Sequence, residues 1–157
     1  MRRFLLISGG LLWCAIASCA PPAQTDSAEE QPAEVIELTQ TGCQFLETES
    51  KDYEYVTKAK ADCEKINTDT LAEREAGFKS LNLKPGKYIF RVTNRNVPYN
   101  LGFYLRGQGD SKGTLPKVSG GGLKEGVTKD YEITLKPGEY VFSCPLNPTP
   151  DYPIIVQ

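Results

Sequence analysis

Short strand-like runs separated by glycine and proline constrain the fold of this chain most. Residues 88–94 alternate Tyr, Phe and Val with Ile, Arg and Thr, and residues 35–41 alternate in part. A period of two is typical of β-strands that bury one face. Further strand-like runs lie at residues 101–105, 131–135, 139–143 and 153–156. Short strands punctuated by turns predict an all-β fold, and we expect a Greek-key β-sandwich.

Two segments repeat one turn-and-strand pattern. Residues 83–90 read Leu-Lys-Pro-Gly-Lys-Tyr-Ile-Phe, and residues 135–142 read Leu-Lys-Pro-Gly-Glu-Tyr-Val-Phe. Proline followed by glycine fits the central positions of a type II turn, because proline fixes a negative φ and glycine accepts a positive one. We expect each Pro-Gly pair to form such a turn and to lead into a strand.

One region departs from the strand pattern. Residues 62–80 are rich in Ala, Glu, Lys and Arg, and Thr70-Leu71-Ala72-Glu73 has the form of a helix-capping box. The region therefore predicts a short helix inserted within residues 62–80 that ends near Gly77. We expect it to lie on the surface and to cover an edge or an end of the sheets.

The N-terminal segment has the features of an export signal. Residues 1–18 combine two arginines with an apolar run that is too short to remain in a bilayer. The sequence Ile-Ala-Ser-Cys at residues 16–19 resembles the bacterial lipobox, which implies cleavage before Cys19 and lipidation of its thiol. An ordinary cleaved signal peptide is the alternative. The lipobox implies a protein anchored by lipid on the periplasmic side of a membrane, and Ala20 implies the outer membrane in a host with two.

A linker connects this anchor to the domain. After Cys19, the linker at residues 19–34 contains three prolines and four acidic residues but no large apolar side chain. Such a segment cannot bury enough surface to order itself, so we expect a flexible tether. Residues 35–157 then form a single domain.

The composition excludes several classes of function. The net charge is -2 and no basic block occurs, which disfavours a nucleic-acid partner. The chain contains no histidine, which disfavours most hydrolytic and copper chemistry, and no catalytic dyad is recognisable, so we expect no enzyme. A cluster of acidic residues lacks the glycine and the final glutamate of a calcium loop, and we expect a solvated face there. The cluster consists of Glu47, Glu49, Asp52 and Glu54.

Two segments resemble the cupredoxins, the plastocyanin-like blue-copper family. Residues 92–103 contain Val-Thr-Asn and then Val-Pro-Tyr-Asn-Leu-Gly-Phe, and residues 137–147 read Pro-Gly-Glu-Tyr-Val-Phe-Ser-Cys-Pro-Leu-Asn. The resemblance covers residues 35–157 and implies the cupredoxin-like sandwich. It places the family's four copper ligands, which are His, Cys, His and Met, at Tyr99, Cys144, Asn147 and Tyr152 respectively.

Only the cysteine ligand is retained at these positions. A blue-copper centre needs two imidazoles and a thiolate, with a weak axial thioether. Phenol and amide oxygens are poor substitutes, so we expect no cofactor and no bound copper. Instead, Tyr99 and Tyr152 are expected to fill the pocket, with their hydroxyls at its rim near Asn147. Cys144 would then be a small buried apolar residue.

The loop after Cys144 is rich in proline and tyrosine. Four of the nine residues at 145–153 are proline, which makes the loop stiff. Rigidity can replace the metal that holds such a loop in the cupredoxins. Alternatively, the loop forms a docking end for a protein partner together with residues 96–99 and a turn at residues 120–122. In the cupredoxins this end meets the redox partner, and both interpretations stay open.

The remaining cysteines predict a disulfide. Export permits oxidation, and a Cys43–Cys63 bond would close a loop of about twenty residues that stabilises the fold by roughly 3 kcal/mol. Pairing of Cys144 with either of them is not excluded by spacing. We therefore expect a membrane-anchored docking or structural module. One alternative is electron transfer or copper binding through Cys144 with ligands other than histidine, and another is thiol redox or metal-thiolate chemistry.

Overall fold

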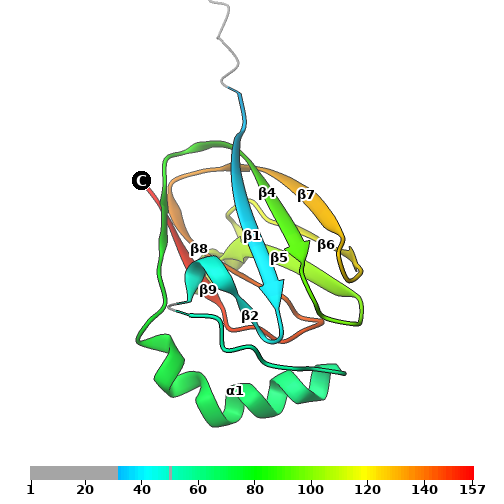
Figure 1. Ribbon diagram of the computed structural model, residues 1–157. Helices are drawn as coiled ribbons and strands as arrows, with labels where there is room; N and C mark the ends of the chain where they lie inside the picture. Colours follow the sequence, from blue (N-terminus) through cyan, green and yellow to red (C-terminus); the bar gives the residue numbers. More distant parts are fainter. Residues whose placement is uncertain (1–31, 50) are drawn as a thin grey trace, which may run out of the picture.

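Two β-sheets form the body of the molecule. The computed structural model describes residues 32–49 and 51–157. The first sheet has the strand order β2 (Gln44–Phe45), β1 (Glu34–Thr41), β4 (Gly86–Asn94), β7 (Thr128–Leu135). The second sheet has the order β3 (Leu81–Leu83), β9 (Tyr152–Val156), β8 (Gly138–Ser143), β5 (Leu101–Gly107), β6 (Val118–Leu123). The fold is thus the all-β sandwich that the sequence predicts (Figure 1).

The core lies between the sheets and is largely aromatic. In β4, Tyr88, Phe90 and Val92 are buried and alternate with more exposed residues, as the sequence period requires. Phe103 of β5 is central, because its ring contacts rings from both sheets at centroid distances of 5.0–6.2 Å. These rings belong to Phe45, Phe90, Tyr131 and Phe142. Such contacts add to the free energy of burial that holds the sheets together.

The strand register gives the sandwich two distinct ends. Glu34 pairs with Tyr88 at the start of β1 and β4, which run parallel. Gly138 pairs with Val156 at the same end, which we call the Glu34 end. The opposite end, where β1, β4 and β8 finish, carries Cys144, and we call it the Cys144 end. Figure 1 shows the start of β1 and the C-terminus at one end, and α1 and β2 at the other.

The one α-helix among the described residues, α1, covers the Cys144 end. It spans Lys60–Glu75 and thus ends before Gly77, near the expected place. The Asp62 carboxylate accepts hydrogen bonds from the backbone of Lys58 and Ala59 at 2.7 and 3.0 Å, which fixes the start of the helix. The expected capping box at Thr70 is wrong, because Thr70 lies inside the helix and its hydroxyl donates to the backbone carbonyl of Ile66.

Both Pro-Gly pairs lead into strands, but their turns differ from the expected type. Gly86 begins β4 and Gly138 begins β8. Gly86 has no positive φ and Gly138 has φ 150°, whereas a type II turn needs about +80° at this position. In each turn, a tyrosine hydroxyl instead donates to the backbone carbonyl of the residue four positions earlier, at 2.9 or 3.0 Å. The bonds join Tyr88 to Lys84 and Tyr140 to Lys136.

Two further expectations concern the glycines at residues 120–122 and the N-terminal segment. The expected glycine turn at residues 120–122 is part of β6, where the Tyr131 ring packs so closely on Gly120 that a Cβ there would approach it to 2.8 Å. The signal segment at residues 1–18, Cys19 and the linker up to residue 31 lie outside the described residues. In the part of the chain that is described, no helix is both long and apolar enough to cross a membrane.

Candidate functional site

Three of the four positions aligned with copper ligands meet at the Cys144 end. Cys144 directly follows β8, and Asn147 lies three residues later in the loop before β9. Tyr99 lies in the loop between β4 and β5. Cys144 and Asn147 are fully buried, whereas Tyr99 is half-buried.

The Cys144 thiol is buried and held by the backbone. Its sulfur accepts N–H groups from Gly102 and Asn147, both at 3.3 Å. Burial raises the pKa of Cys144, and these N–H donors oppose that rise without cancelling it. Cys144 is therefore a protonated thiol at neutral pH, and a buried protonated thiol is a poor nucleophile.

The Asn147 side chain connects the loops around this thiol. Its Nδ2 donates to the backbone carbonyl of Thr41 at 3.0 Å. Its Oδ1 accepts the Tyr99 hydroxyl at 2.9 Å and the backbone N–H of Cys43 at 3.4 Å. The expected hydrogen bond between Tyr99 and Asn147 is thus present, and burial raises the pKa of Tyr99, which keeps its hydroxyl a donor.

The expected Cys43–Cys63 disulfide is also present and lies against Asn147. Both cysteines are fully buried, and Cys63 Sγ is 2.9 Å from Asn147 Oδ1. This is a packing contact, because a disulfide sulfur has no proton to donate. The bond joins the turn after β1 to α1, and Cys144 remains free.

Tyr152 occupies a different place from the one expected. It is fully buried in β9, and its ring contacts Phe78, Phe142 and Phe45. Its hydroxyl donates to the Glu49 carboxylate and not to Asn147, so its expected position at the rim is wrong. The reason is the alternation of β9, which points residues 152, 154 and 156 into the core. Burial, together with the Glu49 charge, raises the pKa of Tyr152.

A buried ion pair beneath α1 was not expected. The side chains of Glu49 and Arg74 are each 1% exposed, so Glu49 is not part of a solvated face. Arg74 Nε donates to Glu49 at 3.0 Å, and the guanidinium also donates to the Cys43 carbonyl and to Asn67. Burial tends to lower the pKa of Arg74, but the bond to Glu49 and its charge raise it overall. Glu49 and Arg74 are 25 residues apart, and no local pattern links them.

The side chains at this site do not fit a blue-copper ion. The donors that meet here are one thiol, one phenol and one amide, without an imidazole or a thioether, and the amide oxygen already accepts two hydrogen bonds. Across residues 32–49 and 51–157, no three His, Cys, Asp or Glu side chains are grouped to hold a metal ion. The Tyr99 hydroxyl, the Asn147 amide and the Cys144 sulfur thus already have hydrogen-bond partners within the protein.

Two exposed apolar side chains, Val56 and Leu146, lie at the same end. Among the described residues, the large apolar side chains classed as exposed are Val35, Val56 and Leu146, at 41%, 84% and 45%. Leu146 borders a hollow of about 580 Å³ on the second sheet. Val56 borders one of about 440 Å³ beside Pro98. Val35 lies on β1 near the Glu34 end.

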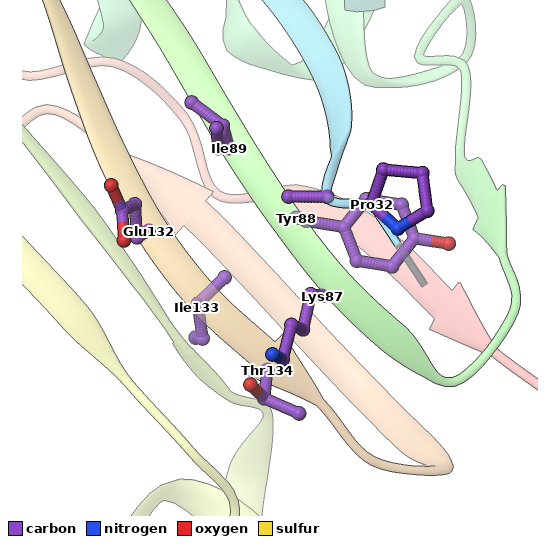
Figure 2. A pocket seen from close by; sticks show the side chains of 8 residues that line it. Pro32, Lys87, Tyr88, Ile89, Glu132, Ile133 and Thr134 are labelled. Carbon is purple, nitrogen blue, oxygen red and sulfur yellow. The ribbon is translucent and has the colours of Figure 1, made fainter. Parts of the chain in front are cut away.

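A third hollow, of about 640 Å³, lies at the Glu34 end. Figure 2 shows Pro32 and Tyr88 on one side of it and Ile133 and Thr134 of β7 on another. It contains none of the expected site residues. It marks the place where the chain enters the domain.

No protein-family model matches the chain, and no curated protein matches it either. The geometry of the Cys144 end is therefore the basis for a functional proposal.

Proposed function

We propose that this protein is a copper-free, cupredoxin-like lipoprotein that acts without catalysis, by docking a protein partner at its Cys144 end. The observation that carries the proposal is the position of Val56 and Leu146. Both are exposed apolar side chains. Leu146 directly precedes Asn147, and Val56 directly precedes Thr57, whose hydroxyl lies 3.3 Å from that of Tyr99. Apolar patches that border hollows are typical of sites where proteins associate.

The arrangement of the aligned positions supports the resemblance to cupredoxins. Tyr99 and Asn147 are 48 residues apart, yet they are joined by a hydrogen bond. The backbone N–H of Asn147 also donates to the sulfur of Cys144, which directly follows β8. Residues aligned with ligands of one ion are expected to converge in this way, even where the ion is no longer held.

Burial weighs against the two alternatives. Copper-dependent electron transfer through Cys144 needs further strong donors, and the neighbouring amide and phenol are weak ones. Thiol–disulfide exchange needs an accessible thiolate, but the thiol and both disulfide cysteines are fully buried. Docking requires neither group to react.

The proposed anchor fits this use of the Cys144 end. The domain begins at the Glu34 end, so a lipid at Cys19 would hold it by the end opposite the docking surface. The fifteen residues from Cys19 to residue 33 can extend to about 50 Å. The Cys144 end would thus face away from the membrane, towards a partner on the periplasmic side.

Photocrosslinking in native membranes tests the proposal. A photoreactive phenylalanine analogue replaces Leu146 in one variant and Val56 in another. Val35 provides the matched control, because its exposure of 41% is close to the 45% of Leu146 while it lies near the opposite end. We expect one discrete crosslinked species from Leu146 and Val56, and none from Val35.

Equal crosslinking from both ends, or none from the Cys144 end, would contradict the docking function. Metal analysis of the same purified protein separates the copper alternative. An intense visible band from thiolate-to-copper charge transfer after addition of Cu(II) would favour electron transfer instead.

A further inference from the structure

The hollow beside Leu146 has a floor made of glycine. Gly102 of β5 and Gly121 of β6 are register partners on the outer face of the second sheet. Leu146 overhangs both, since its Cδ1 atom would lie 3.5 and 3.9 Å from a Cβ at these positions. Tyr104 and Ser119 form the next pair along the strands. We call this surface the glycine shelf; it consists of Gly102, Tyr104, Lys117, Ser119, Gly121, Pro145 and Leu146.

Packing explains one of the two floor glycines but not the other. A Cβ at Gly102 would approach the Gly120 carbonyl to 2.9 Å, so the fold requires glycine there. A Cβ at Gly121 would meet its nearest atoms at 3.8 and 3.9 Å, which is ordinary contact, and the φ of Gly121 is not positive. Glycine weakens a strand, so Gly121 lowers the stability of β6 at a position where packing does not require glycine. What it provides is an open floor.

The charge at the shelf is positive. Lys117 is the charged residue that lines it, and no carboxylate does. The side chain of Lys129 reaches from β7 to β6, where its ammonium group donates to the Gly121 carbonyl at 2.8 Å. Arg106 stacks on Tyr104, but its two hydrogen bonds to the Asp151 carboxylate neutralise its positive charge. A partner segment on the shelf would therefore gain from negative charge.

We infer that the glycine shelf binds an extended acidic segment of the protein partner. An apolar side chain of that segment lies on Gly121 between Leu146 and Tyr104, and a carboxylate pairs with Lys117. The inference rests on the proposed docking function and specifies the partner surface that this function uses. The shelf contacts the segment through side chains, because β6 pairs with β5 and its Gly120 and Gly121 carbonyls already accept bonds from Tyr131 and Lys129.

Fluorescence anisotropy with defined peptides tests the inference. The probes are labelled peptides in which leucine alternates with glutamate, with lysine or with glutamine. We expect the glutamate peptide to bind at least about tenfold more tightly than the lysine peptide. Binding should weaken as salt is added, because exposed charges are screened.

Two variants locate the binding on the shelf. Gly121→Val fills the floor. It is expected to weaken binding of the glutamate peptide about tenfold or more without lowering the unfolding midpoint of the protein. Lys117→Glu is expected to shift the preference towards the lysine peptide. Gly113→Val and Lys112→Glu are matched controls, since a Cβ at Gly113 meets nothing within 4 Å and both residues lie outside the shelf.

Equal binding of the acidic and basic peptides, no binding of either, or indifference to Gly121→Val would overturn the inference. If crosslinking from Leu146 persists in that case, the docking function stands and only the assigned partner chemistry fails. If crosslinking is also absent, both fail.

Discussion

At the scale of single residues, the Asn147 side chain connects the loops of the Cys144 end. Its amide binds the backbone of Thr41 and Cys43 and the hydroxyl of Tyr99. An asparagine amide can satisfy several partners at once, because it carries both donors and an acceptor. The stiff loop that carries Asn147 is thereby fixed to β1 and to the loop before β5.

Asn147→Ala is expected to lower the free energy of unfolding by about 2–4 kcal/mol, because it leaves two buried backbone groups without partners. Urea unfolding at neutral pH measures the loss. Tyr99→Phe is the matched control and removes only one hydroxyl, at an expected cost of about 1 kcal/mol. Equal costs for the two variants would show that Asn147 has no connecting role.

The Cys144 thiol predicts a specific alkaline effect. Its pKa is raised by burial in the folded state, so its stabilising contribution is complete below the thiol pKa of the unfolded chain, about 8.5, and is lost as pH rises above it. The wild-type protein should therefore lose up to about 1.4 kcal/mol per pH unit relative to Cys144→Ala. Unfolding free energies of both proteins between pH 7 and 10 measure the difference. Parallel curves would mean that the thiol is not buried in solution.

Two contacts of the Cys144 end were predictable from the sequence. The Cys43–Cys63 bond followed from export and loop length, and the Tyr99–Asn147 contact followed from the alignment with ligand positions. The Glu49–Arg74 pair was not predictable, because its residues look like members of a solvated loop and a solvated helix. Only the three-dimensional fold removes both side chains from water.

At the scale of elements, α1 is attached to the sandwich by very few side chains. Cys63 and Arg74 are its buried residues; one is bonded to Cys43 and the other to Glu49. Asn67 adds a hydrogen bond to the Pro148 carbonyl at 2.7 Å, and the Arg74 guanidinium also donates to the Cys43 carbonyl. The position of α1 therefore depends mainly on the disulfide, the ion pair and these two hydrogen bonds. The helix is otherwise polar, which is why its sequence predicted a surface element correctly.

Arg74→Met is expected to lower the free energy of unfolding by about 3–5 kcal/mol, because it leaves the Glu49 carboxylate buried and unpaired. Adding Glu49→Leu should recover much of this loss, since two apolar side chains leave no buried charge. Urea unfolding of both single variants and the double variant gives the coupling energy. Additive effects would contradict a direct interaction between the two residues.

The strands were predicted better than their connections. The alternating runs at residues 35–41, 88–94 and 139–143 lie almost entirely within β1, β4 and β8. Strand β6 was expected to be a turn, because its three glycines resemble one in a sequence. Their fit against Gly102 and Tyr131 depends on neighbouring strands, and local propensity does not contain that information.

At the scale of the whole molecule, the direction of β1, which runs parallel to β4, places the proposed anchor and the proposed docking surface at opposite ends. Because β1 starts at the Glu34 end, the linker joins the domain opposite Leu146 and Val56. If Cys19 carries the proposed lipid, the length of the linker sets how far from the membrane the Cys144 end can reach. Its composition should matter less, provided that it remains flexible.

Deleting residues 22–31 tests this role of the linker. The five residues left between Cys19 and residue 33 span about 17 Å, in place of about 50 Å for the full linker. We expect crosslinking from position 146 to fall several-fold in native membranes, while the unfolding midpoint of the domain stays unchanged, because the deletion lies outside both sheets. A Gly/Ser segment of the original length should restore the crosslink. If the shortened protein crosslinks as well as the full chain, the partner lies close to the membrane surface and the linker is not a spacer.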